Sequence, residues 1–161
     1  WSAEGLSSIK VPVLYIAGSE DGVSGYEDGI RRMWEETASV DRALLTYVNA
    51  GHNAGAPMPA PAEGRAVDPD LGFAPFEHYA DPVWDSVRMN NIAQHFVTAW
   101  LDFQVKGDAS RAPNLDLVAD AQDGVWSMDG DGTPAADHTY WEGFANGTAK
   151  GLRLEWRRAA E

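Results

Sequence analysis

The feature that most constrains this chain is a nearly continuous apolar run at residues 9–18, Ile-Lys-Val-Pro-Val-Leu-Tyr-Ile-Ala-Gly. The run ends in the turn-forming group at 18–22, Gly-Ser-Glu-Asp-Gly. An apolar run without the alternation of a half-solvated strand is typical of a strand that is covered on both faces, as in a parallel sheet. Because parallel strands need crossover connections, usually helices, the run predicts an α/β fold.

A helix and a second buried strand follow this first strand. Residues 24–34 carry apolar side chains at helical spacing, and the S-x-x-E spacing of Ser24 and Glu27 predicts a capping box. Residues 43–49, Ala-Leu-Leu-Thr-Tyr-Val-Asn, form another apolar run that ends at the turn 50–53. Strand, helix and strand with short connections predict a βαβ unit. The apolar positions of the predicted helix are Tyr26, Ile30, Met33 and Trp34.

The rest of the chain is predicted to hold one long helix between two irregular segments. Residues 54–80 are rich in Pro, Ala and Gly, and a loop of that length is typical of lids and binding loops. Asp81 and Pro82 predict the N-cap and first turn of a closing helix over about 82–105. The residues from 108 onward are rich in turns, and we expect one or two short strands there. The apolar face predicted for the closing helix consists of Val83, Val87, Ile92, Phe96, Trp100 and Phe103.

Charge and composition exclude several classes of function. Twelve Lys and Arg face 25 Asp and Glu, for a net charge of −13, so we expect no nucleic-acid partner and no membrane partner, because phosphates and anionic lipids require a basic surface. No apolar run approaches the roughly 18 residues that a membrane-spanning helix needs. The absence of Cys removes disulfides, zinc–thiolate sites and Cys nucleophiles, and it leaves the cellular compartment open. Four His without an H-E-x-x-H pattern predict no metal site, and no cofactor is expected.

One acid and one histidine follow the two predicted strands. Asp21 comes after the first strand and His52 after the second. Because the C-terminal ends of parallel strands meet at one edge of a sheet, we expect these two side chains to lie side by side. A carboxylate fixes the tautomer of a neighbouring imidazole and stabilises the imidazolium that forms when His takes a proton from a nucleophile. Asp21 and His52 are therefore the candidate catalytic residues, with Glu20 as the competing acid and Asn53 as a turn residue.

Four segments resemble the α/β-hydrolase fold, in particular its dienelactone-hydrolase-like members. Residues 11–21 resemble the penultimate strand and acid loop of that fold, and residues 50–52, Ala-Gly-His, resemble its catalytic His loop. Residues 99–108 resemble the closing helix of the dienelactone-hydrolase-like members, and residues 137–144 resemble the C-terminal extension of some of them. The resemblance implies that Asp21 and His52 are two members of a catalytic triad.

The chain departs from this family in one important respect. The family's triad runs Ser, acid, His along the chain, with the Ser in a G-x-S-x-G elbow. No such elbow occurs here, and Ser19 belongs to the acid loop. The resemblance therefore implies that residues 1–107 are the C-terminal part of a hydrolase domain, with its last two core strands and flanking helices, and that residues 108–161 are an irregular extension packed on it. The nucleophile and oxyanion hole are then expected in an N-terminal portion of the same enzyme, upstream of residue 1.

Two functions follow from these observations. The favoured one is serine-dependent hydrolysis of a small-molecule carboxylic ester or lactone, with a dehalogenase left open because the nucleophile is missing. We expect the chain alone to be inactive and, because its strands would expose unpaired edges, to aggregate or fold only partly. The alternative is a non-catalytic module on a hydrolase remnant that binds a carbohydrate or a protein through its Trp-rich tail. Trp84, Trp126 and Trp141 could stack on such a ligand, although packing on the hydrolase body is the favoured expectation.

The remaining candidate residues are expected to be structural. His95 lies beside the apolar face of the closing helix, and His78 and His138 lie in aromatic-rich irregular segments. Residues 129–132, Asp-Gly-Asp-Gly, are similar to the start of a calcium loop but lack the EF-hand spacing and its terminal Glu. This segment therefore predicts a tight, solvated turn.

Overall fold

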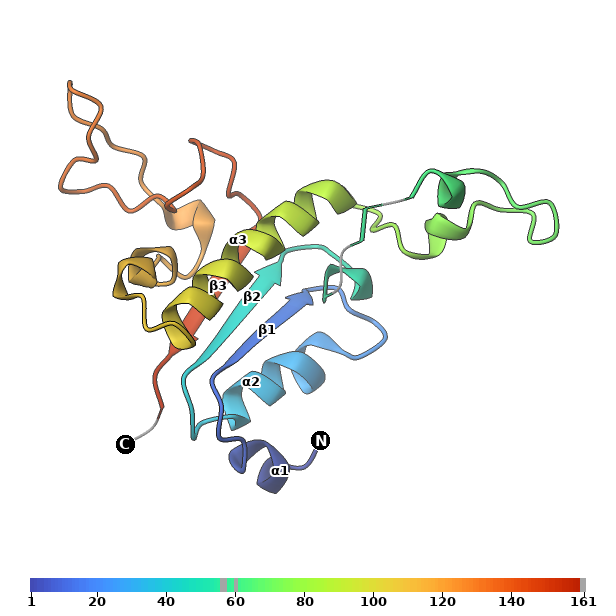
Figure 1. Cartoon of the computed structure of the whole chain (residues 1–161), viewed down its shortest axis with the longest axis horizontal. Coiled ribbons are helices and arrows are strands. Elements are labelled where there is room, and N and C mark those ends of the chain that lie inside the picture. Colours follow the sequence, from blue (N-terminus) through green and yellow to red (C-terminus); the bar gives the residue numbers. More distant parts are fainter. Residues whose placement is uncertain (56–57, 60, 160–161) are drawn as a thin grey trace.

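The computed structural model describes residues 1–55, 58–59 and 61–159 and contains a three-stranded mixed sheet (Figure 1). The strands are β1 (Val13–Gly18), β2 (Arg42–Tyr47) and β3 (Leu152–Arg157), in the order β1-β2-β3. β1 and β2 are parallel, as the predicted βαβ unit requires, whereas β3 runs antiparallel to β2. The protein is therefore α/β, and its sheet contains the parallel strand pair that the sequence predicts.

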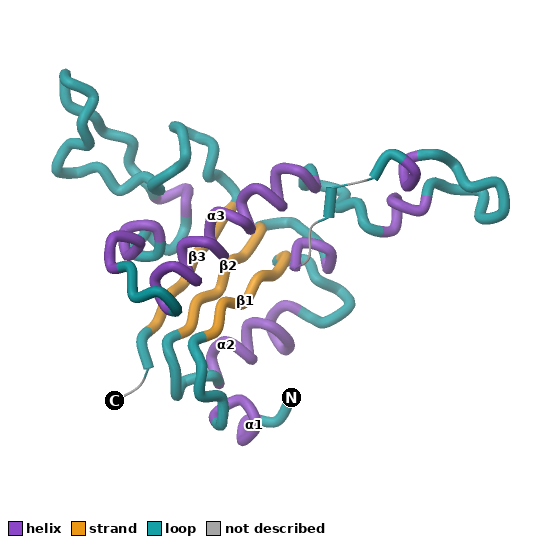
Figure 2. The backbone as a smooth tube through the Cα atoms, viewed as in Figure 1, coloured by secondary structure: helices purple, strands orange, loops and turns teal. Residues whose placement is uncertain are grey.

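Helices lie on both faces of this sheet. The long helix α3 (Ser86–Gln104) crosses one face, and α1 (Ala3–Ser7) and α2 (Arg32–Glu36) lie on the side of β1 (Figure 1). A π-helical turn, Tyr26–Arg31, runs directly into α2. Figure 2 shows that loops and short helical turns make up most of the remaining chain, and in Figure 1 residues 61–80 (green) project away from the sheet as an arm. None of the helices in the described ranges is long and apolar enough to cross a bilayer.

The α3 side of the sheet holds the apolar core. Odd-numbered residues of β2, such as Leu45 and Tyr47, point to this side and are fully buried together with Leu152 and Leu154 of β3. The hydroxyl of Tyr47 donates to the carbonyl of Met89 on α3 at 2.8 Å, which ties the helix to the central strand. Alternation along β2 and β3 therefore places apolar residues under α3, whereas the opposite face carries the polar residues together with the fully buried Leu44.

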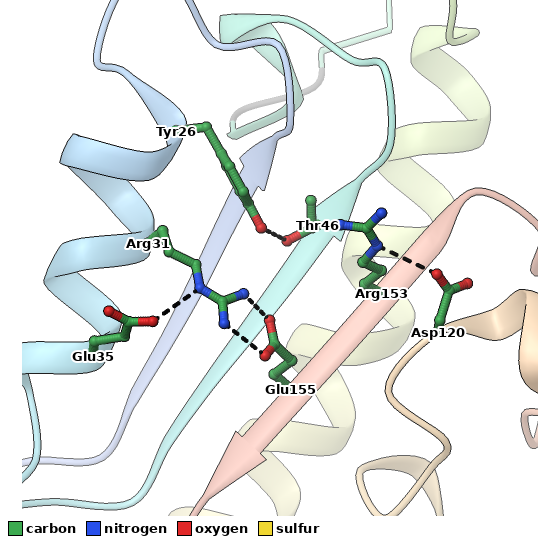
Figure 3. Close-up of polar contacts among 7 residues, drawn as sticks. All are labelled: Tyr26, Arg31, Glu35, Thr46, Asp120, Arg153 and Glu155. Carbon is green, nitrogen blue, oxygen red and sulfur yellow. Dashed lines mark hydrogen bonds and ion pairs between the residues drawn. The ribbon is translucent and has the colours of Figure 1, made fainter.

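The opposite face is joined by polar contacts (Figure 3). Arg31, at the end of the π-helical turn, forms a bidentate ion pair with Glu155 of β3. Near the other end of the same turn, the Tyr26 hydroxyl shares a buried 2.8 Å hydrogen bond with Thr46 of β2. These contacts fix the segment that follows the acid loop against the sheet.

The first predicted helix begins differently from the expectation. The S-x-x-E pattern of Ser24 and Glu27 does not form a capping box, because the helical segment starts at Tyr26 after Gly25, with no side-chain cap. The Ser24 N–H instead donates to the carboxylate of Asp21 at 2.9 Å. The acid of the preceding loop has therefore taken over the donor that the capping box would have used.

The closing helix also begins later than predicted. α3 starts at Ser86 rather than at Pro82, and its N-cap is Asp85, which accepts the Arg88 N–H at 2.8 Å. Val83 lies before the helix, and Val87 lies on the side of α3 away from its buried positions, so both are exposed rather than part of the core face. The buried positions on α3 are Ser86, Met89, Ile92, Phe96, Ala99, Trp100 and Asp102.

The C-terminal tail contributes more to the sheet than its composition indicated. We expected one or two short strands without a place for them, and β3 from this tail pairs with the whole length of β2. The parallel pairing expected for the first two strands is confirmed, whereas β3, for which no direction was predicted, is antiparallel to β2. Because β2 has a neighbour on each side, all six of its residues are buried.

β1, in contrast, lies at an edge of the sheet. The N–H groups of Val13 and Ser19 donate toward the β2 side, to Asp41 and Tyr47. Since alternate peptide groups of a strand face opposite edges, the N–H groups of Leu14 and Ile16 face away from β2. No strand among the described residues pairs with this edge, although the turn His52–Gly55 approaches it at the Ile16 carbonyl. Val13 to Ile16 are only half-buried.

We predict that Phe96→Ala destabilises the protein by about 3–5 kcal/mol, because Phe96 is fully buried and packs against Trp141 and Phe144. Leu101→Ala on the same helix is the matched control. Leu101 is 48 % exposed, so this change should cost well under about 1 kcal/mol. Urea denaturation measures both values, and equal losses would contradict the assignment of the core face.

Candidate active site

The two loops that carry the candidate residues emerge at one edge of the sheet. Gly18 at the end of β1 is the register partner of Tyr47 at the end of β2. Asp21 follows three residues after Gly18, and His52 begins the 3-10 turn His52–Gly55 after β2. The structure therefore places both side chains at the C-terminal ends of neighbouring parallel strands, where α/β proteins build their sites.

The two loops approach each other closely at Gly18. A Cβ atom added at this position would lie 2.2 Å from the carbonyl oxygen of Ala50 and 2.3 Å from that of Gly51. One residue further along the acid loop, the Ser19 hydroxyl accepts the Asn49 N–H at 2.8 Å, and the Glu20 N–H donates to the Ala50 carbonyl at 2.9 Å. Only glycine fits between the loops, and the main chain on both sides of it holds them together.

Asp21 and His52 are in direct contact. The Nδ1 atom of His52 lies 3.0 Å from Oδ2 and 3.1 Å from Oδ1 of Asp21. The Oδ1 atom also accepts the N–H groups of Val23 and Ser24, each at 2.9 Å. Asp21 is buried, whereas the His52 side chain is about half exposed. The carboxylate is thus fixed by its own loop and presents its oxygens to the imidazole.

These contacts determine the protonation state of Asp21. Burial raises the pKa of the Asp21 carboxyl, but hydrogen bonds from His52 and from the N–H groups of Ser24 and Val23 outweigh burial and lower the pKa below its ordinary value of 3.8. Asp21 is therefore ionised at neutral pH. An ionised carboxylate at Nδ1 favours the tautomer that carries a proton on Nδ1 and leaves Nε2 free to accept one.

A second carboxylate, that of Asp81, positions the His loop. Oδ2 of Asp81 accepts the Gly51 N–H at 2.7 Å, and Oδ1 accepts the N–H groups of Val83 and Trp84 at 2.9 and 2.8 Å. Asp81 was expected to cap the closing helix. It instead closes the turn before that helix and ties this turn to the residue that precedes His52. The Asp-Pro sequence indicates a turn residue of this kind, but not which loop its second oxygen contacts.

The arm formed by residues 61–80 is also attached to the His loop. The side-chain amide of Asn53 donates to the carbonyl of His78 at 2.8 Å. The ring of His78 makes a T-shaped contact with Phe73 within the arm. Asn53 is therefore more than the turn residue that was expected, because it joins the base of the arm to the residue next to His52.

The described residues supply a candidate base, His52 held by Asp21, but no nucleophile in contact with it. The nearest hydroxyl is that of Ser24, whose Oγ lies 3.4 Å from Nδ1 of His52, the nitrogen that already contacts Asp21. Within the described ranges, no side chain hydrogen-bonds to Nε2 of His52, the atom through which a triad histidine activates its serine. Asp21 and His52 can therefore deprotonate a nucleophile that reaches Nε2 from elsewhere.

The other candidate residues lie outside this contact. Glu20 is exposed, and no side-chain hydrogen bond involving it occurs among the described residues. His95 packs against Phe96 and Phe144, and burial lowers its pKa. His138 contacts the main chain of Ser127. No group of three His, Asp or Glu side chains in the described part of the chain could hold a metal ion.

Two further expectations from the sequence can be compared with the structure. Residues 129–132 form a tight turn, as predicted, in which the Gly132 N–H donates to the Asp129 carbonyl at 2.9 Å. Trp84 and Trp141 are buried, as favoured, whereas Trp126 is 39 % exposed.

No protein-family model, curated protein or solved structure matches the chain. The resemblance to dienelactone-hydrolase-like enzymes therefore stays a prediction. The structural observation that bears on function is the contact between Asp21 and His52.

We predict that Gly18→Ala destabilises the complete protein by about 1–3 kcal/mol or more, because the new Cβ meets two main-chain carbonyls that cannot move independently. Gly22→Ala in the same loop is the control, since nothing lies within 4 Å of its added Cβ. Thermal unfolding of the two variants measures the difference. Equal melting temperatures would show that the two loops do not approach each other at Gly18.

We also predict a pH dependence that identifies the Asp21 carboxylate. The folded-state pKa of Asp21 is lowered, so its contribution to stability is complete above its ordinary value of 3.8 and is lost as pH falls through the lower folded-state value. The stability difference between wild type and Asp21→Asn should therefore be largest at neutral pH and shrink in acid. Urea denaturation from neutral to acidic pH measures it, with Glu20→Gln as the control for losing one charge. A difference that grows in acid would contradict the assignment.

Proposed function

We propose that the chain forms the C-terminal part of a serine-dependent hydrolase of carboxylic esters or lactones. The observation that carries the proposal is the contact of the Asp21 carboxylate with Nδ1 of His52 at the C-terminal edge of two parallel strands. An ionised acid at one imidazole nitrogen, with the other nitrogen free of a partner within the described chain, is the arrangement that a general base requires.

In the proposed reaction, a serine of the N-terminal portion attacks the ester carbonyl. His52 accepts the serine proton at Nε2, and Asp21 stabilises the resulting imidazolium. His52 then donates that proton to the leaving alkoxide, which gives an acyl-enzyme. Water, deprotonated by His52, releases the acid and restores the serine. Main-chain N–H groups of the N-terminal portion stabilise the oxyanion in both steps.

The open edge of β1 supports a continuation of the sheet on that side. The N–H groups of Leu14 and Ile16 face this edge, and the strand is only half-buried although its sequence is apolar throughout. A neighbouring parallel strand would pair these groups and cover the apolar side chains. Such a strand would end near the turn His52–Gly55, which approaches this edge at the Ile16 carbonyl, and so on the side of the sheet that carries Asp21 and His52.

The alternative function is a non-catalytic module that uses the Trp-rich tail to bind a carbohydrate or a protein. The absence of a hydroxyl partner for Nε2 of His52 within the described residues favours this alternative. On this hypothesis Asp21 would serve only to fix the His loop. The two functions differ in a measurable way, because only the hydrolase requires His52 for turnover.

We predict that His52→Ala and Asp21→Asn each lower kcat/KM of the complete enzyme for p-nitrophenyl acetate by several orders of magnitude. His52→Ala removes the base, and Asp21→Asn removes the charge that favours the active tautomer. Glu20→Gln is the matched control on the same loop and should leave the rate near that of wild type. Labelling of the serine by a fluorophosphonate gives a second readout that does not depend on the choice of ester.

Two outcomes would contradict the proposed hydrolase. Turnover of His52→Ala at close to the wild-type rate would exclude His52 as the base. A complete protein that neither hydrolyses activated esters nor reacts with a fluorophosphonate would support the binding module instead.

A further inference from the structure

A cavity in the described part of the C-terminal tail lies away from the Asp21–His52 contact. Its volume is about 710 Å³, which is within the range of small-molecule sites. Its lining comes from two parts of the tail, residues 112–117 and 126–144, and includes neither Asp21 nor His52. The cavity is therefore a site that the proposed hydrolysis does not use.

Aromatic side chains form much of the cavity wall. Trp126, Tyr140, Trp141 and Phe144 line it, and 39 % of Trp126 is exposed. The centre of an aromatic face carries partial negative charge, so a wall of this kind attracts cations as well as apolar groups. Trp126 is the most accessible of the four rings and is the one that a ligand can reach most directly.

The wall is held rigidly in place. Phe144 stacks against Phe96 of α3 at 5.9 Å between ring centroids, and Trp141 makes an edge contact with the same ring at 5.6 Å. The Tyr140 hydroxyl accepts the Ala149 N–H at 2.9 Å, just before β3 begins. The cavity is thus supported by α3 on one side and by the strand on the other, which lowers the conformational cost of binding.

The polar groups of the cavity are predominantly negative. Asp116 and Glu142 line it, and neither forms an ion pair with any described residue. No Lys or Arg lines the cavity. Two other polar lining residues are already occupied, since Thr139 accepts the Val125 N–H and His138 contacts the main chain of Ser127. The two carboxylates, both exposed, are therefore the charged groups left for a ligand, and the buried Nε1 of Trp141 is a further polar group of the lining without a partner among the described residues.

We propose that this cavity binds a small organic cation of the alkylammonium class. The aromatic wall accommodates the methyl or methylene groups and faces the positive charge, while Asp116 and Glu142 neutralise it. The net charge of −13 adds a favourable field for a cationic ligand. A neutral sugar would stack on Trp126 equally well, but it would leave the two carboxylates without a positive partner.

Calorimetric titration of the full-length protein with choline tests the proposal, with 3,3-dimethylbutan-1-ol as the neutral molecule of the same shape. We expect saturable binding of choline and binding of the alcohol at least about tenfold weaker, because the alcohol lacks the charge. Methyl β-glucoside is the probe for the sugar alternative and should not compete with choline.

Two variants identify the residues involved. The double variant Asp116→Asn/Glu142→Gln should weaken choline binding about tenfold, and Trp126→Leu should weaken it severalfold. The matched control, Asp123→Asn/Asp129→Asn, removes two exposed carboxylates of the same tail that do not line the cavity, and it should leave the affinity unchanged.

Three results would overturn the proposal. Equal affinity for choline and 3,3-dimethylbutan-1-ol would show an apolar pocket without charge recognition. Binding of methyl β-glucoside but not of choline would show a carbohydrate site. No binding of any of the three probes by a protein whose circular dichroism shows it folded would exclude a ligand site of this size. None of these results affects the test of His52 as a base, which measures ester turnover.

Discussion

The geometry of the candidate site depends on the Asp21 carboxylate, which accepts hydrogen bonds from its own loop and contacts His52 on the next one. A buried carboxylate is costly unless its oxygens are paired, and here the N–H groups of Val23 and Ser24 and the imidazole supply the partners. Gly18 makes this possible because it lets the two loops meet without a side chain between them. Asp21, which would orient a catalytic histidine, therefore also joins the loop after β1 to the loop after β2.

The sheet is asymmetric in a way that bears on function. β2 has a strand on each side and is buried throughout, whereas β1 has a neighbour on one side and is half-buried over most of its length. Asp21 and His52 lie at the C-terminal ends of these two strands, next to the edge of β1 that faces away from β2. A hydrolase completed by a strand on this edge, as proposed, would explain both the apolar sequence of β1 and the lack of a described hydrogen-bond partner for Nε2 of His52. The Asp21–His52 contact and the unpaired side of β1 thus lie at the same edge of the sheet.

The C-terminal tail contributes to both the sheet and the aromatic cavity. β3 pairs with β2 along its whole length, and the aromatic residues that precede β3 pack on α3 around Phe96. The hydrogen bond from the Ala149 N–H to the Tyr140 hydroxyl joins the cavity wall to the residues that lead into β3. This connection and the packing on Phe96 attach the cavity wall to the body of the protein. A ligand bound there would contact a rigid part of the protein rather than a loose extension.

The sequence by itself determined the βαβ unit, the long helix and the proximity of Asp21 to His52, because apolar runs and the geometry of parallel strands are local properties with one consistent solution. It did not determine the start of α3 or the role of Asp81, because both depend on which main-chain donor a carboxylate meets in the folded protein. The pairing of β3 with β2 and the aromatic cavity were likewise decided by tertiary structure. Residues 152–157 alternate clearly between apolar and polar, but their partner lies more than one hundred residues away, and no local pattern specifies contacts over that distance.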